Sequence, residues 1–132
     1  MISGKQLHGL RVYDKNGTQV GIVQDMTADR SSGAVRGFII SSTGILSKTA
    51  FIPSSRVLHL DEYGMVICGR GKAKKAALQR ENGEMHLGEL VSSKGHVTDI
   101  FLEKDRIWAA ELSQGLLADI NAGRQIYPWD EL

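Results

Sequence analysis

The chain has 132 residues, of which 42% are hydrophobic and 23% charged, and this composition excludes a disordered protein. Its net charge of +1 excludes a general attraction to nucleic acid or to an anionic membrane, so any such attraction must come from a local cluster. The length suits one ordinary domain or two very small ones, and the single cysteine, Cys68, excludes an internal disulfide and favours a reducing compartment.

Short apolar runs separated by glycine-containing turns predict an all-β arrangement for the first half of the chain. The connections are too short for helical crossovers, so we expect a small barrel or a strongly bent sheet. The expected strands cover residues 10–13, 19–26, 34–40, 51–53, 57–60 and 65–68.

The segment DKNGTQVGIVQD, residues 14–25, has features of two ligand loops. A helix-loop-helix calcium site needs glycine at the sixth position and glutamate at the twelfth, where this chain has Gln19 and Asp25. The glycine spacing also differs from that of a phosphate loop. We therefore interpret the segment as a hairpin turn in which Asn16 and Gly17 accept positive φ angles, followed by a strand that bends or packs closely at Gly21.

The composition changes after residue 69. Residues 70–80, RGKAKKAALQR, contain five basic and no acidic side chains, and their alanine, lysine and leucine content predicts a helix. This divides the chain into a first domain over residues 1–69, a basic helical connector over 70–82, and a second domain over 83–132.

The second half repeats the first in order and in approximate spacing, which indicates a tandem duplication. Four segments of the first half recur. Residues 23–26 recur as 97–100, residues 34–40 as 106–112, residues 44–46 as 115–117, and residues 51–57 as 126–132.

These residues resemble the PRC-barrel family, which is named for the cytoplasmic domain of the photosynthetic reaction-centre H subunit and also includes the C-terminal domain of a bacterial ribosome-maturation factor. The resemblance is good over about residues 5–68 and weaker over about 83–132. It depends on the order and spacing of short motifs. They are Leu7-x-Gly9-x-x-Val12-Tyr13-Asp14-x-x-Gly17-x-x-x-Gly21-x-Val23-x-Asp25, then Gly33-x-Val35, then Ile52-Pro53-x-x-x-Val57.

The resemblance implies small β-barrels that dock onto proteins, ribosomal components or membrane complexes and perform no known chemistry. The long N-terminal domain of the ribosome factor and the membrane helix of the H subunit have no counterpart here, so neither specific function carries over. The second copy stops at Leu132, about ten residues short of the first. We expect another segment or a partner chain, including a second copy of this protein, to close it, or the sequence to be cut short.

No arrangement of residues predicts catalysis, and we expect no cofactor, metal or small-molecule substrate. The histidines, His8, His59, His86 and His96, are far apart in sequence and pair with no cysteine. Cys68 is expected to be a small buried hydrophobic residue.

Two groups of residues are candidates for partner contacts. The basic group could meet RNA phosphate or an acidic protein, although a solvated helix is the alternative and the absence of interleaved aromatics argues against base stacking. The apolar group could anchor a protein partner, with core packing as the alternative, and Trp108 is expected in the core. The basic group is Arg70, Lys72, Lys74, Lys75 and Arg80, and the apolar group is Ile45, Leu46, Leu116, Leu117 and Trp129.

The sequence thus predicts two tandem PRC-like β-barrels that act as a non-catalytic adaptor on a protein or ribonucleoprotein partner. An accessory role in RNA processing or ribosome assembly and a membrane-peripheral scaffold are the alternatives. An enzyme would require an unrecognised cleft between the barrels. With no apolar run of about 18 residues and no signal-peptide pattern, we expect a cytoplasmic protein that reaches membranes only through a partner.

Overall fold

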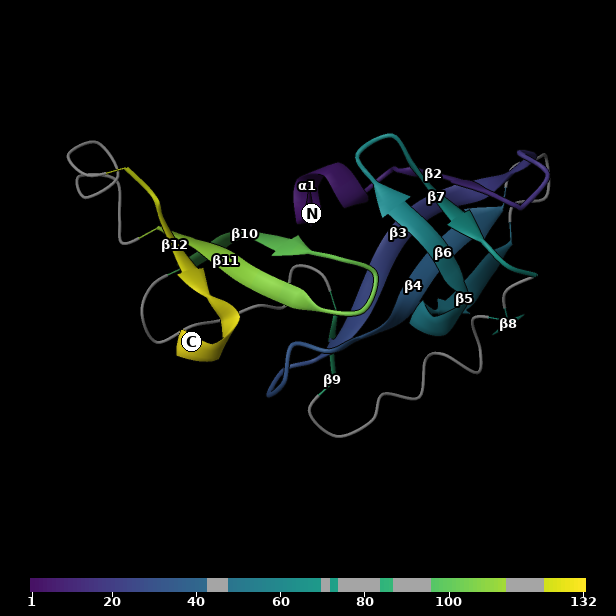
Figure 1. The fold of residues 1–132 in the computed structure, drawn as a ribbon. Helices are drawn as coiled ribbons and strands as arrows, with labels where there is room; N and C mark the ends of the chain where they lie inside the picture. Colours follow the sequence, from purple (N-terminus) through teal and green to yellow (C-terminus); the bar gives the residue numbers. More distant parts are fainter. Residues whose placement is uncertain (43–47, 70–71, 74–83, 87–95, 114–122) are drawn as a thin grey trace.

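In the part of the chain that it describes, the computed structural model is built from two β-sheets with almost no helix, which confirms the predicted all-β class (Figure 1). It describes residues 1–42, 48–69, 72–73, 84–86, 96–113 and 123–132. Sheet A has the strand order β1-β10-β11-β12, and sheet B has the order β6-β7-β2-β3-β4-β5-β8, with β9 paired to β3 beside this path.

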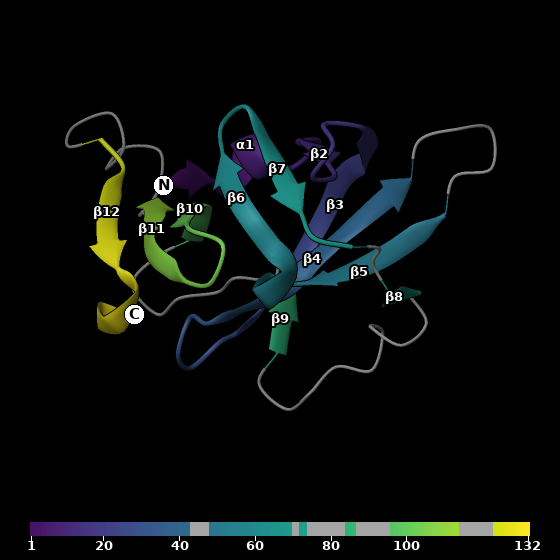
Figure 2. The ribbon, with the colours of Figure 1, turned by 45° about the vertical axis from the view of Figure 1, so that its right-hand side comes forward.

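Sheet B is strongly bent, with β6 and β7 running in a very different direction from β4 and β5 (Figure 2). This agrees with the barrel-like sheet expected for the first half. Its strands are β2 (Arg11–Tyr13), β3 (Gln19–Asp29), β4 (Val35–Ser42), β5 (Thr49–Pro53), β6 (Val57–Asp61), β7 (Gly64–Ile67), β8 (Lys72–Ala73) and β9 (Glu84–His86).

Sheet A is smaller and contains the first strand of the chain. Its strands are β1 (Ile2–Ser3), β10 (His96–Leu102), β11 (Ile107–Ser113) and β12 (Gln125–Pro128). The described helical elements are single turns: α1 (Gly4–Leu7), η1 (Ser54–Arg56) and η2 (Trp129–Glu131). α1 was not expected from the sequence, and it begins with a capping box in which Ser3 and Gln6 satisfy each other's backbone N–H groups.

The segment at residues 14–25 is a turn followed by a strand, as predicted. The Asp14 carboxylate accepts hydrogen bonds from the backbone N–H groups of Asn16 and Thr18, at 2.9 and 3.0 Å. Gly17 has φ +81°, whereas Asn16 keeps a negative φ. A side chain at Gly21 would collide with the backbone oxygen of Ser41, so the close packing expected at this glycine is confirmed.

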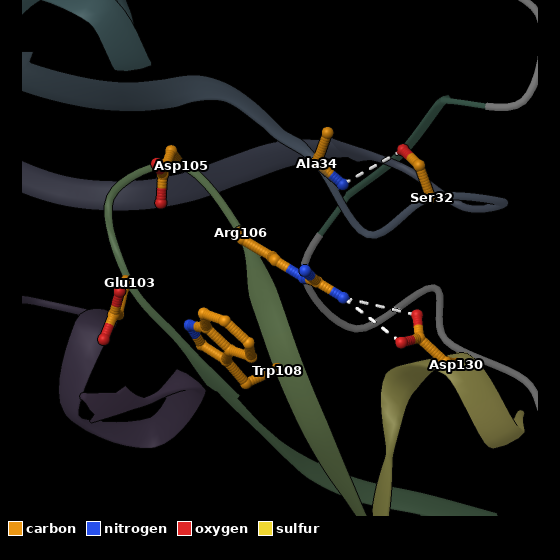
Figure 3. A pocket seen from close by; sticks show the side chains of 7 residues that line it. All are labelled: Ser32, Ala34, Glu103, Asp105, Arg106, Trp108 and Asp130. Carbon is orange, nitrogen blue, oxygen red and sulfur yellow. Dashed lines mark hydrogen bonds and ion pairs between the residues drawn. The ribbon is translucent and has the colours of Figure 1, made fainter.

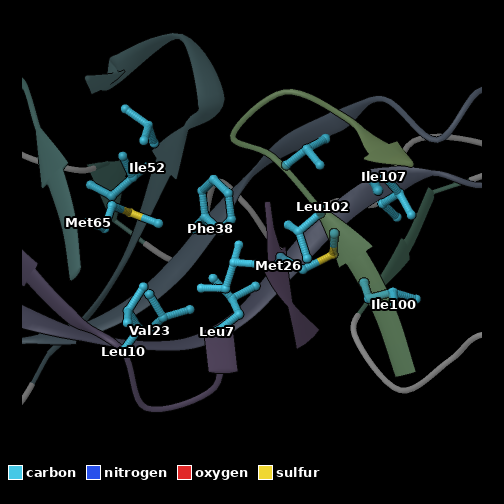
Figure 4. Packing of buried hydrophobic residues seen from close by; sticks show 14 of the residues in the cluster. Leu7, Leu10, Val23, Met26, Phe38, Ile52, Met65, Ile100, Leu102 and Ile107 are labelled. Carbon is cyan, nitrogen blue, oxygen red and sulfur yellow. The ribbon is translucent and has the colours of Figure 1, made fainter. Parts of the chain in front are cut away.

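One hydrophobic core joins the two sheets (Figure 4). Phe38 from β4 and Met26 from β3 belong to the same buried cluster as Leu102 and Ile107 from sheet A. Small domains need this shared burial, because each sheet alone would leave one apolar face in water.

Sheet A reproduces the register of the central part of sheet B. The strand pairing of each hairpin shifts in register at two places. The first shift lies between Val23 and Asp25 in β3 and between Val97 and Asp99 in β10. The second lies near the end of the same strands. The third strands match as well, because Gly37 pairs with Pro53 while Ala109 pairs with Pro128. Both prolines lead into a single 3-10 turn. The register therefore pairs residues 97–100, 107–112 and 126–128 in the same way as residues 23–26, 35–40 and 51–53, which lie in the segments that the sequence aligned with them.

The two halves also exchange strands. β1, from the start of the chain, pairs with β10, where Ser3 lies opposite Phe101. β9 pairs with β3, where His86 lies opposite Thr27, the residue that corresponds to Phe101. The predicted boundary between residues 69 and 83 therefore does not separate the two sheets. Lys72, expected in a helix, lies in β8 and pairs with β5, which corrects the helical prediction at residues 72–73.

The turns of the two hairpins meet through reciprocal hydrogen bonds. The N–H of Val35 donates to the carbonyl of Asp105 at 2.9 Å, and the N–H of Ile107 donates to the carbonyl of Gly33 at 2.7 Å. Val35 corresponds to Ile107 and Gly33 to Asp105, so the two contacts are equivalent. The junction of the sheets is thus a two-fold-like contact between turns.

Candidate interaction site at the junction of the two sheets

An open pocket of about 660 Å³ lies at this junction (Figure 3). The turn before β4 supplies one wall, the turn between β10 and β11 supplies the second, and η2 supplies the third. The lining residues are Ser32, Ala34, Glu103, Asp105, Arg106, Trp108 and Asp130.

A β-bulge places Trp108 at the surface. Phe101 pairs with Ala109 and Leu102 with Ile107, so Trp108 is the extra residue of β11 at this register shift. Ile107 is fully buried, whereas Trp108 is 41% exposed. The preceding turn is closed by a hydrogen bond of 2.8 Å from the N–H of Glu103 to the carbonyl of Arg106. The backbone beneath the pocket is therefore held on both sides by the core and by ladder hydrogen bonds. The expectation that Trp108 is a core residue was wrong.

Arg106 is fixed between an aromatic ring and a carboxylate. Its guanidinium carbon lies 4.5 Å from the centroid of the Trp108 ring, and its Nη2 lies 3.3 Å from both carboxylate oxygens of Asp130. Its Nε is buried and has no hydrogen-bond partner among the described residues. Cation–π stacking of this kind contributes about 0.5–1 kcal/mol at exposed positions. The arginine and the indole thus form an ordered stacked pair at the surface.

The pocket carries more negative than positive charge. Three carboxylates, those of Glu103, Asp105 and Asp130, face a single guanidinium. All three acidic residues are exposed, and Asp130 keeps 76% of its side chain in water although it pairs with Arg106. The arrangement favours cations and disfavours phosphate.

The equivalent positions in the first hairpin carry different side chains. By register, Arg106 corresponds to Ala34, Trp108 to Arg36, and Asp130 to Ser55. The same backbone therefore forms with an alanine, an arginine and a serine in these places. The arginine, tryptophan and aspartate are not required by the hairpin architecture.

Outside the pocket, two histidines pair with aspartates. Nδ1 of buried His86 lies 2.8 Å from the carboxylate of Asp25, and Nε2 of exposed His59 lies 2.6 Å from that of Asp61. The hydrogen bond from His59, together with backbone N–H donors, holds the pKa of Asp61 below its ordinary value of 3.8. Among the described residues, no three His, Cys, Asp or Glu side chains are grouped as metal ligands. Cys68 is half-buried rather than fully buried.

The predicted contact residues do not meet at one site in the described structure. Trp129 is 6% exposed and packs on Gly33, so its side chain is part of the core, the alternative that the sequence favoured. Lys72 lies in β8. The others lie outside the described residues: Ile45, Leu46, Arg70, Lys74, Lys75, Arg80, Leu116 and Leu117.

The residues that do form a pocket, Arg106, Trp108 and Asp130, were not selected from the sequence. The signal was available in the repeat alignment, which sets Arg106 and Trp108 against Ala34 and Arg36.

A strongly bent all-β sheet of short strands is typical of small barrel-like domains. The sequence matches the family model of the PRC-barrel domain over residues 1–67, and the chain belongs to this family. No curated protein matches the sequence. Within the described part of the chain, no helix has the length and apolar character needed to cross a membrane.

Proposed function

We propose that the protein is a non-catalytic docking module that binds a protein partner through the pocket at Trp108. The observation that carries this proposal is a large indole, 41% exposed, held in place by an arginine stacked on its face. Tryptophan and arginine dominate the residues that contribute most to protein–protein binding energy. Because both side chains are already ordered, binding would cost little conformational entropy.

The internal comparison supports the proposal. The β3–β4 hairpin has the same backbone register, with Ala34 and Arg36 in place of Arg106 and Trp108. Exposing an indole to water is unfavourable, and the hairpin does not need it. A binding role accounts for its presence.

We also propose that residues 83–132 are a second, divergent PRC-barrel copy. The shared register of the two hairpins supports this, as do the matching Pro53 and Pro128 turns and the reciprocal hydrogen bonds between Gly33, Val35, Asp105 and Ile107. On this proposal the pocket lies between two related barrels, with one wall from the first and two from the second.

Affinity capture from an extract of the source organism tests the docking function. The immobilised wild-type protein is compared with Trp108→Ala and with Tyr63→Ala, which removes an aromatic side chain that is 82% exposed and lies outside the pocket. We expect at least one protein to be retained by the wild type and by Tyr63→Ala and to be lost with Trp108→Ala.

Nuclease treatment of the extract separates a direct protein partner from a ribonucleoprotein. A partner that survives the treatment is bound as protein. Capture of the same proteins by all three forms of the bait would contradict docking through Trp108.

A further inference from the structure

We infer that the Trp108 pocket receives a lysine or arginine side chain from an extended segment of the partner protein. This inference rests on the docking function proposed above and names the chemistry of the partner. Its basis is the combination, in one pocket, of an exposed aromatic ring and an excess of carboxylates.

The two carboxylates on one side of the pocket are available to a cation. In Figure 3, Glu103 and Asp105 lie on one side of the stacked Trp108–Arg106 pair, and Asp130 lies on the other. Both are exposed, and neither forms an ion pair with another described residue. A cation placed here would neutralise charges that Arg106 leaves unpaired.

Arg106 shows that this surface accommodates a guanidinium. It stacks on the indole at 4.5 Å and pairs with a carboxylate at 3.3 Å, which are the two interactions that a partner cation would make with the remaining indole surface and with Glu103 or Asp105. The partner would therefore repeat, from outside, a contact that the chain already makes within itself.

The shape of the pocket favours a side chain presented by a protein segment. The pocket is open and about 660 Å³ in volume, within the roughly 300–1,000 Å³ of typical ligand pockets but not enclosed. An open pocket buries little of a free small cation, whereas an extended segment can add contacts along the rim. Nucleic acid is disfavoured, because its phosphates would approach three carboxylates.

The test uses the full-length ¹⁵N-labelled protein and short capped peptides. One peptide carries a central lysine and its neutral match carries norleucine; a second pair carries arginine and citrulline. The chain has two tryptophans, so two indole N–H signals report on the exposed Trp108 and on the buried Trp129. We expect the Trp108 signal to move and saturate with the cationic peptides, while the Trp129 signal stays in place as the folding control.

Charge variants make the test specific. Glu103→Gln with Asp105→Asn is expected to raise the dissociation constant about tenfold, which corresponds to the loss of the close ion pairing. The matched control, Glu62→Gln with Glu131→Gln, removes the same charge from exposed residues outside the pocket and should change it less than about twofold.

Equal shifts with the neutral peptides, no shift with any peptide, or equal weakening by the control pair would overturn the inference. A short RNA that moves the Trp108 signal more than the cationic peptides would also overturn it. The two proposals can be told apart. If Trp108→Ala loses a captured partner while the cationic peptides leave the Trp108 indole signal unchanged, the docking proposal stands and the inference of a basic partner segment is wrong.

Discussion

The hairpins β3–β4 and β10–β11 have the same register, the same two shifts and equivalent contacts at their turns, yet only the second contributes an exposed tryptophan to the pocket between them. The difference lies in a few side chains, chiefly Ala34, Arg36 and Ser55 against Arg106, Trp108 and Asp130. The same hairpin backbone therefore carries different surface side chains in this fold. Substitutions in the pocket should alter binding with little loss of stability, whereas substitutions at shared positions should do the reverse.

The two tryptophans give the largest expected contrast. Trp129→Ala should lower the free energy of unfolding by about 3–5 kcal/mol, because it removes a buried indole that packs on Gly33. Trp108→Ala should cost about 1 kcal/mol or less, since the indole is 41% exposed. Urea unfolding followed by circular dichroism measures both. Comparable losses would mean that the pocket side chain supports the fold, which would break the comparison.

Asp25 and Asp99 lie at the same register shift in the two hairpins, and their substitution gives the next largest expected effect on stability. Asp25 accepts from the N–H of Met26 and pairs with buried His86, whereas Asp99 accepts from the N–H of Ile100 at 2.8 Å and from that of Lys5 at 3.3 Å. We expect Asp25→Ala to cost about 2–3 kcal/mol and Asp99→Ala about 1 kcal/mol, because loss of Asp25 also leaves the buried His86 side chain without this acceptor. The same urea assay ranks them. The reverse order would show that the exchanged strand β9 contributes little through His86.

The ion pair on the pocket rim should matter least to stability. Asp130→Asn removes the charge that faces Arg106, but the pair is long and Asp130 is 76% exposed, so we expect a loss of about 0.5 kcal/mol or less. Thermal unfolding in low and moderate salt measures it, with Glu131→Gln as the neighbouring control. A loss above about 1 kcal/mol would indicate that Arg106 is held mainly by Asp130 rather than by Trp108.

The turn between β3 and β4 contains a carboxyl group, that of Asp29, whose pKa is lowered in the folded state. The hydroxyl and N–H of Ser31 donate to Asp29 at 2.8 and 2.9 Å and hold the pKa of this carboxyl below its ordinary value of 3.8. A lowered pKa in the folded state means that the stabilisation is complete above pH 3.8 and is lost as the pH falls through the folded value. Because Asp29 is exposed, the effect on stability is small.

Carboxyl titration by NMR detects this shift directly. In Ser31→Ala the midpoint for Asp29 should move up towards 3.8, without returning fully because the backbone donors remain. An unchanged midpoint would show that the hydroxyl has no part in the shift. Asp61, whose pKa is lowered by His59, serves as an internal reference in the same spectra.

The sequence predicted the strands well where turn residues mark them. Asp14 and Gly17 define their turn through local side-chain hydrogen bonds and a positive φ, which depend on neighbouring residues alone. The similarity of the two hairpins was also visible in the sequence, because the Val-x-Asp motif and a proline turn occur at the corresponding positions of both.

Other features depended on contacts that local sequence does not encode. The pairing of β1 with β10 and of β9 with β3 joins residues about a hundred and about sixty positions apart, and nothing in a two- or three-residue strand specifies such a distant partner. The burial of Trp129 also involves a distant contact, because its ring lies against the turn at Gly33 from the other hairpin. The pocket was missed because its walls come from both hairpins and from η2.

The reciprocal pairing of β1 and β9 ties the integrity of each half to the other. If the chain were cut between β8 and β9, the N-terminal fragment would carry a strand of sheet A and would lack one of sheet B, and the C-terminal fragment would be the converse. Neither fragment would be self-sufficient, since the common core would also be divided. The cut protein should persist as a non-covalent pair through fragment complementation. In the intact molecule, the same interlock makes unfolding a single cooperative event across both sheets.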